Sequence, residues 1–155
     1  MTIPVPDLGE LYQAVILDHN RSPRNFREIP DASGDAQGYN PLCGDQVHIW
    51  IKVEDGRIAD CTFRGDGCAI SKASASLMTA ALKGKTVAEA EALFDQFHRV
   101  LTGGASASET LPSKLEVFRG VAAFPIRVKC ATLAWHAFRE ALESSTSHTH
   151  DGSTS

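Results

Sequence analysis

Residues 47–64 read VHIWIKVEDGRIADCTFR, and this stretch decides the fold. Apolar and polar side chains alternate from Val47 to Val53, which is the period of a strand with one buried face. Asp55-Gly56 then supplies a tight turn of the kind that joins two antiparallel strands. The stretch therefore predicts a β-hairpin over residues 46–64, which forms a small antiparallel β-sheet.

Helical patterns surround this hairpin on both sides. A capping pattern at Asp7 predicts a first helix, and apolar residues at helical spacing predict further helices from Ala69, from Thr86 and from about Cys130. Prolines and glycines interrupt residues 20–39, so an ordered but irregular connection is expected there. Together these patterns predict an α+β fold in which the sheet packs against helices.

Length and composition indicate a single domain. The chain has 155 residues, of which 43% are hydrophobic and 22% are charged, and it is long enough to bury a core of its own. Residues 144–155 are rich in Ser, Thr and His and contain no apolar side chain. We therefore expect one domain over residues 1–143 and a disordered tail over residues 144–155.

Charge and hydropathy argue against several classes of function. The net charge of -4 disfavours nucleic acid as the main partner, because phosphate binding calls for a basic surface. No run of about 18 apolar residues is present for a membrane span, and residues 1–10 lack a secretory pattern. We expect a cytoplasmic protein without a membrane partner. In that reducing compartment the 4 cysteines are better explained as metal ligands or reactive thiols than as disulfides.

Three cysteines and one aspartate are candidate metal ligands. They are Cys43, Asp45, Cys68 and Cys130. Thiolate sulfur and carboxylate oxygen both bind zinc, and four such groups complete a tetrahedral shell. Cys68 is expected at a helix N-terminus, where unpaired N–H groups and the helix dipole favour a thiolate. Cys61 falls on the apolar face of the second hairpin strand, with Ala59, and is expected to pack in the core.

The residues around these ligands resemble the IscU/NifU family of iron–sulfur cluster assembly proteins, and within it the SufU branch. The resemblance rests on four stretches, which are DHNRSPRN (18–25), PLCGD (41–45), GCAIS (67–71) and RVKCATLAW (127–135). Lys129 stands where scaffold members of the family have a histidine ligand, and a protonated ammonium has no lone pair for a metal. A longer segment between Leu101 and Phe124 also resembles the SufU branch.

The resemblance implies a SufE/IscU-like fold and a zinc-dependent sulfurtransferase. Cys43, Asp45, Cys68 and Cys130 would hold Zn2+, and Cys43 would accept persulfide sulfur from a SufS-type cysteine desulfurase that carries pyridoxal phosphate. Downstream SUF scaffold proteins would then receive the sulfur. Arg127 is a candidate to orient Asp45 or to stabilise a thiolate.

Other functions stay open at this point. The same ligands could hold an iron–sulfur cluster, which would make the protein an IscU-like scaffold. A structural zinc site would make it a binding module, although closed structural shells are normally built from Cys and His only. A zinc hydrolase is disfavoured, because an all-protein shell leaves no open position for water. Whether a sulfur acceptor of this kind counts as an enzyme is also open.

Overall fold

The structure is a computed structural model that describes residues 14–41, 44–103, 111 and 113–154. Its elements follow in the order β1 (Gly34–Asn40), β2 (Asp45–Glu54), β3 (Arg57–Asp66), α2 (Ala69–Leu82), α3 (Val87–Thr102), η1 (Ser113–Ala123) and α4 (Pro125–Thr154). Residues 14–21 form a further helix before β1. The α+β class expected from the sequence is confirmed.

The predicted hairpin is formed by β2 and β3. These strands pair antiparallel, and Glu54 lies opposite Arg57 across the turn. The turn residues Asp55 and Gly56 have positive φ angles of 55° and 75°, which is the conformation that a two-residue hairpin turn requires. The alternation of the sequence and the chemistry of the turn therefore identified this hairpin correctly.

The expectation of an irregular connection over residues 20–39 is wrong for its last part, which forms strand β1. It pairs antiparallel with β2 from Gly34 to Asn40, so the sheet has three strands in the order β1-β2-β3. The glycines of β1 allow α4 to lie close to the strand. A Cβ atom at Gly34 would come within 2.3 Å of the Ala141 carbonyl oxygen, so no other residue fits there without a shift of the backbone.

A β-bulge moves one residue away from its predicted face. The pairing shifts between Lys52 and Val53, which leaves Ala59 of β3 without a partner opposite. Ala59 is therefore exposed and Ile58 is buried, contrary to the expectation that Ala59 shares the apolar face. Cys61 is buried as expected, and this burial raises the pKa of its thiol far above the ordinary value.

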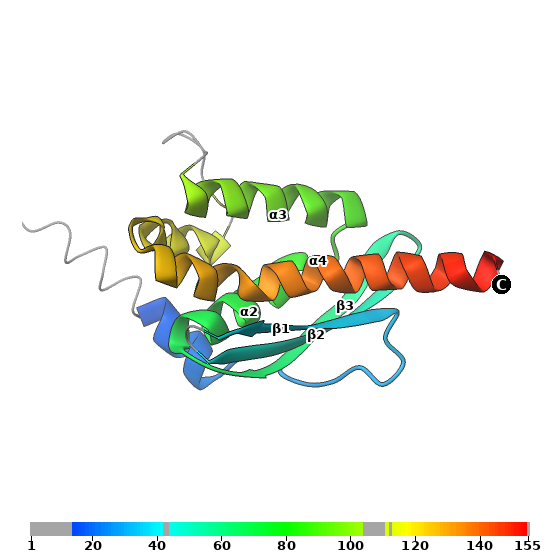
Figure 1. The fold of residues 1–155 in the computed structure, drawn as a ribbon, viewed down its shortest axis with the longest axis horizontal. Coiled ribbons are helices and arrows are strands. Elements are labelled where there is room, and N and C mark those ends of the chain that lie inside the picture. Colours follow the sequence, from blue (N-terminus) through cyan, green and yellow to red (C-terminus); the bar gives the residue numbers. More distant parts are fainter. Residues whose placement is uncertain (1–13, 42–43, 104–110, 112, 155) are drawn as a thin grey trace, which may run out of the picture.

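Helices cover one face of the sheet in two layers, as Figure 1 shows. α4 lies along β1 and β2, α2 packs against β3, and α3 and η1 form the outer layer. The ring of Phe97 stacks on Trp135 with centroids 4.3 Å apart and meets Phe118 edge-on at 5.8 Å. These aromatic contacts join α3, η1 and α4 into one core. Within the described part of the chain, no helix combines the length and the apolar composition needed to span a membrane.

The helix boundaries follow the sequence signals at α3 and differ at α4. Thr86 and Glu89 form the expected capping box of α3. α4 begins at Pro125, a residue suited to the first turn of a helix. The helix therefore starts before Cys130, which lies in its second turn, near the start as expected. The backbone of α4 continues to Thr154. The disorder of residues 144–155 and the single-domain division stay predictions.

Candidate metal centre

Three of the four expected ligands meet at the start of β2. One ligand atom each from Asp45, Cys68 and Cys130 lies within 4.8 Å of the others. Asp45 begins β2, Cys68 precedes α2, and Cys130 belongs to α4, so the packing of both helices on the sheet creates the cluster. Cys43 lies outside the described residues, and its place as the fourth ligand stays a prediction.

Hydrogen bonds hold the carboxylate of Asp45 next to Cys68. The Asp45 side chain is fully buried, and its Oδ1 accepts a 2.9 Å hydrogen bond from the backbone N–H of Cys68. Its Oδ2 lies 3.7 Å from Cys68 Sγ. An oxygen and a sulfur ligand of one tetrahedral zinc ion are about 3.5 Å apart. The second carboxylate oxygen and the thiol are therefore already close to the spacing of two ligands.

Cys68 is the N-cap of α2. Its Sγ accepts a 3.4 Å hydrogen bond from the backbone N–H of Ser71, a contact that Ser, Thr, Asp or Asn usually makes at this position. The N–H groups at a helix start carry partial positive charge and stabilise a thiolate. The expected place of Cys68 at a helix N-terminus is confirmed.

Cys130 is held by a buried contact between α2 and α4. It is 1% exposed, and the next residue, Ala131, accepts a 2.5 Å hydrogen bond at its carbonyl from the Ser74 hydroxyl. Ser74 Oγ also accepts a 3.1 Å hydrogen bond from the indole N–H of Trp135. Ser74 of α2 is therefore bonded to α4 immediately beside the ligand.

Gly67 makes room for the Asp45 carboxylate. A Cβ atom at Gly67 would lie 2.4 Å from Asp45 Oδ1 and 2.9 Å from Asp45 Cγ, which is closer than such atoms can approach. Any side chain at this position would displace the carboxylate or the backbone. No role for Gly67 was predicted from the sequence, and the signal that could have indicated one is a glycine directly before a candidate ligand.

Two basic residues, Arg127 and Lys129, lie close to Cys130 in the sequence. Arg127 and Lys129 are both exposed, and among the described residues Arg127 forms no ion pair with Asp45. The expected action of Arg127 on the centre stays a prediction. Residue 129, directly before Cys130, is an exposed lysine, so this position offers no histidine nitrogen to a metal.

The stretch at residues 18–25 packs against α2. His19 is 4% exposed, and its Nδ1 lies 2.7 Å from Ser76 Oγ. The same hydroxyl accepts a 2.8 Å hydrogen bond from the backbone N–H of Arg24, and Asn25 donates to Thr79 at 3.0 Å. These contacts hold residues 19–25 against α2. The residues of this stretch that resemble the family therefore pack against α2, and none of them belongs to the ligand cluster.

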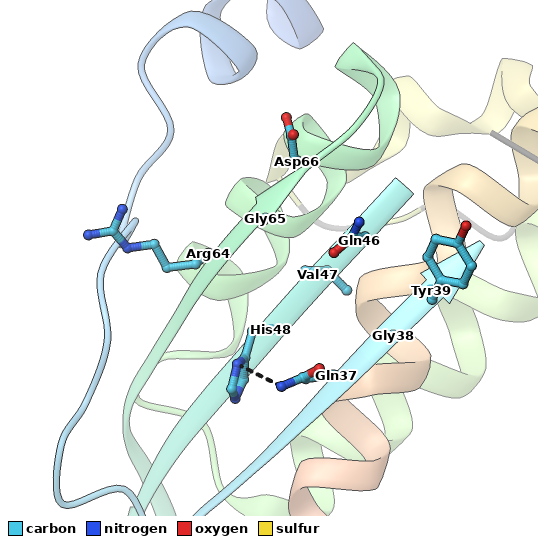
Figure 2. A pocket seen from close by; sticks show the side chains of 9 residues that line it. All are labelled: Gln37, Gly38, Tyr39, Gln46, Val47, His48, Arg64, Gly65 and Asp66. Carbon is cyan, nitrogen blue, oxygen red and sulfur yellow. Dashed lines mark hydrogen bonds between the residues drawn. The ribbon is translucent and has the colours of Figure 1, made fainter. Parts of the chain in front are cut away.

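An open groove of about 570 Å³ runs across the strands, on the face of the sheet away from α4, because the alternate residue Gly38 is the one that faces α4. Figure 2 shows its lining, which includes His48 from β2 and Gln37 from β1 joined by a hydrogen bond. The His48 ring stacks on Trp50 with centroids 3.9 Å apart, and its Nε2 lies 2.6 Å from Asp35 Oδ2. The groove is lined by none of the three clustered ligands, so it does not form a pocket over them.

Three exposed apolar side chains lie on the segments that lead to the cluster. Tyr39 is 62% exposed, Phe124 is 61% exposed and Ile126 is 59% exposed. Tyr39 is opposite Gln46, and its side chain lies on the face of the sheet away from α4, because the neighbouring Gly38 faces Leu133 of α4. Phe124 and Ile126 lie at the start of α4, in the segment that leads to Cys130. Exposed apolar side chains close together, such as Phe124 and Ile126, are typical of a surface that contacts another protein.

The fold and the cluster define a small α+β protein in which two cysteines and one aspartate lie close enough together to hold a metal ion. Residues 11–150 match the family described as NifU-like N terminal domain, and the chain belongs to this family. The resemblance to the IscU/NifU family found in the sequence is confirmed.

Relatives of the chain carry two kinds of name. The chain is 40% identical to the iron–sulfur cluster assembly scaffold protein IscU of Streptococcus pyogenes serotype M1, over 92% of this chain and 89% of the relative. It is 38% identical to the zinc-dependent sulfurtransferase SufU of Bacillus subtilis (strain 168), over 86% of this chain and 90% of the relative. A crystal structure of FiSufU from Fervidobacterium islandicum AW-1, a proposed scaffold for the SUF system, is 30% identical with a TM-score of 0.79, over 86% of this chain and 97% of that one.

Proposed function

We propose that this protein is a zinc-dependent sulfur carrier of iron–sulfur cluster assembly, which acts in the cytoplasm and takes sulfur from a cysteine desulfurase. The observation that carries the proposal is the convergence of Asp45, Cys68 and Cys130 within 4.8 Å. Cys43 comes two residues before Asp45, so the chain limits the distance between their Cα atoms to about 7 Å. Cys43 can therefore complete the shell.

The chemistry of these side chains fits a zinc ion. Two sulfur atoms and a carboxylate oxygen are ordinary zinc ligands, and bound zinc would keep the cysteines deprotonated at neutral pH. Backbone N–H groups support two of the ligands from outside the shell, at Cys68 Sγ and at Asp45 Oδ1. Such outer contacts orient ligands and strengthen metal binding.

In the proposed reaction, Cys43 is the sulfur acceptor. Its thiolate attacks the outer sulfur of a persulfide on the desulfurase, and a new sulfur–sulfur bond forms on Cys43. The sulfur–sulfur bond of the donor breaks at the same time, and the donor cysteine leaves as a thiolate. The exchange therefore needs no oxidant or reductant. The pyridoxal phosphate of the desulfurase supplies the chemistry that makes the persulfide, and SUF scaffold proteins would receive the sulfur from Cys43.

The exposed surface beside the cluster suits a protein partner. Apolar area is presented at the start of α4 by Phe124 and Ile126, and positive charge close to it is supplied by Arg127 and Lys129. Interfaces of this kind combine apolar anchors with a charged rim. This surface supports a partner that docks over the ligand cluster and brings its persulfide to Cys43.

An iron–sulfur scaffold is the second candidate function. The name of the relative from Streptococcus pyogenes, at 40% identity, favours it. Lys129 argues against it, because it stands exposed beside Cys130 and its ammonium cannot bind iron while it is protonated. A cluster on this chain would have to be held without the histidine that the scaffold branch places there.

Metal analysis of the purified protein separates the two candidates. A colourless protein with one zinc ion per chain supports sulfur transfer, whereas a brown protein with iron and sulfide supports the scaffold. The stronger test adds the protein to a SufS-type desulfurase and measures sulfide production. We expect stimulation that Cys43→Ala abolishes and that Cys61→Ala, which removes a buried thiol, retains. Stimulation that persists with Cys43→Ala would refute the role of Cys43 as acceptor.

A further inference from the structure

We propose that Ser74 is a positioning residue for the metal centre, because it fixes α4 against α2 and so sets the place of Cys130 relative to Cys68. The inference rests on one part of the proposed function, which is that the side chains of Asp45, Cys68 and Cys130 bind a metal ion. It concerns how tightly and in what geometry the metal is held, and it does not depend on sulfur transfer.

The side chain of Ser74 bonds α4 at two points. Its hydroxyl donates to the Ala131 carbonyl at 2.5 Å and accepts from the Trp135 indole N–H at 3.1 Å. Ala131 and Trp135 are four residues apart, which is about one turn of the helix. Two attachments one turn apart oppose both the sliding of α4 along α2 and its rotation about its own axis.

This link lies close to both ligands. Ala131 directly follows Cys130, and Ser74 comes six residues after Cys68, which is about 9 Å along α2. Ser74 is fully buried, so water cannot replace its hydrogen bonds. From the other side, Phe97 of α3 stacks on the Trp135 ring at 4.3 Å, which keeps the indole N–H directed at the hydroxyl. A small change at Ser74 would therefore move Cys130 and alter the spacing of the cluster.

Ser76 provides a matched control on the same helix. It is also fully buried, and its hydroxyl likewise makes two hydrogen bonds, one with His19 and one with the Arg24 backbone. Those bonds tie α2 to residues 19–24 and not to α4. Ser76→Ala therefore removes the same atom and a comparable number of hydrogen bonds without loosening the contact beside Cys130.

The test measures metal affinity by competition with a coloured chelator and the geometry of the site by the absorption spectrum of bound Co2+. We expect Ser74→Ala to raise the zinc Kd roughly 10–100-fold, the loss typical of groups that orient metal ligands, and Ser76→Ala to change it less than about twofold. We also expect the Co2+ ligand-field bands to shift in Ser74→Ala alone. Both variants should melt at a lower temperature than the original protein.

Trp135→Phe is the second variant, in case Ser74→Ala does not fold. It keeps the ring against Phe97 and the bond from Ser74 to Ala131, and it removes the indole N–H, so we expect a smaller rise in the zinc Kd. Unchanged zinc affinity in a folded Ser74→Ala, or equal losses in Ser74→Ala and Ser76→Ala, would overturn the inference, as would unchanged affinity in Trp135→Phe if that variant alone folds. These outcomes leave the proposed sulfur transfer standing, whereas an original protein without zinc affinity would refute both.

Discussion

The backbone N–H of Cys68 donates a 2.9 Å hydrogen bond to Oδ1 of Asp45. The donor is one of the N–H groups that a helix start leaves without a partner inside the helix, and the acceptor belongs to the first residue of β2. The bond leaves Asp45 Oδ2 at 3.7 Å from Cys68 Sγ. One backbone contact therefore satisfies a buried carboxylate and places its other oxygen beside the thiol.

Gly67→Ala should damage this arrangement directly. The new Cβ would meet Asp45 Oδ1 at 2.4 Å and Asp45 Cα at 3.0 Å, so the carboxylate or the backbone must move. We expect the free energy of unfolding to fall by about 1–3 kcal/mol, as for other overpacked sites, together with loss of zinc. Urea unfolding and metal analysis of the same sample measure both effects.

Gly84→Ala is the control for the backbone effect of that substitution. Gly84 has a φ angle of +90° and open space where a Cβ would be, so the variant carries the conformational cost, about 1 kcal/mol, without a clash. Its zinc content should equal that of the original protein. If both glycine variants lost zinc to the same extent, the steric argument for Gly67 would be wrong.

Asp45→Cys tests whether the carboxylate makes the centre exchangeable. A thiolate is a softer zinc ligand than a carboxylate, so we expect the variant to release zinc to a chelator at least tenfold more slowly, a change of about 1.4 kcal/mol. Sulfur transfer should slow as well, because the proposed reaction needs Cys43 to leave the shell. Release and transfer rates equal to those of the original protein would contradict this role.

Local sequence patterns predicted the parts of the fold that local interactions determine. The hairpin was predictable because alternation and the Asp55-Gly56 turn act within a few residues of one another. Strand β1 was not predictable in this way, because its glycines are typical of an irregular connection. In the structure they allow close contact with a helix far along the chain, since a Cβ atom at Gly34 would lie 2.3 Å from the Ala141 carbonyl oxygen. The outward turn of Ala59 depends on a bulge that the alternation does not reveal.

The candidate ligands were predicted from the sequence, but the residues that hold those ligands in place were not. The family resemblance implied that Asp45, Cys68 and Cys130 converge, and the structure brings them together. Neither Gly67 nor Ser74 was given a role, because their importance comes from contacts across 22 and 57 positions of the chain, which are the separations between residues 67 and 45 and between residues 74 and 131. No local pattern carries such information.

Asp60 should make stability depend on pH in the acid range. Burial alone would raise the pKa of its carboxyl, but the hydrogen bond and charge of Arg27, with the charge of Lys83, hold the pKa below its ordinary value of 3.8. The folded chain therefore binds this proton less readily than the unfolded chain. The stabilisation is fully present above the ordinary value and is lost as the pH falls through the lower, folded value.

Asp60→Asn removes that dependence. We expect the free energy of unfolding to fall less steeply with decreasing pH in this variant than in the original protein, measured by urea unfolding between about pH 5 and pH 2. Asp55→Asn, in the hairpin turn, makes the same change of charge and should keep the original slope. Parallel curves for Asp60→Asn and the original protein would show that the contact with Arg27 does not stabilise the fold.

Phe124→Ser should weaken docking of the desulfurase without changing the metal centre. The Phe124 side chain is 61% exposed, so its loss costs the folded protein little, whereas the removal of an apolar anchor from an interface costs more than about 1 kcal/mol. We expect the concentration of this protein that gives half-maximal stimulation of the desulfurase to rise about tenfold. Its zinc content and the maximal stimulation of the desulfurase should not change. Glu54→Ser, at the opposite end of β2 from Asp45, is the control and should behave as the original protein.

Removal of the metal should leave the protein folded. The cluster is formed by β2, α2 and α4, and those elements pack through a core of buried apolar residues that includes Ile49, Met78 and Trp135. A small zinc finger unfolds without its metal because it has no such core. After treatment with a chelator we expect an unchanged far-ultraviolet circular dichroism spectrum and a lower melting temperature. With free zinc about 1,000-fold above Kd, the bound form should be more stable by about 4 kcal/mol. A chelated protein that loses its helical signal at room temperature would show instead that the metal, and not the packing of α2 and α4 on the sheet, brings Asp45, Cys68 and Cys130 together.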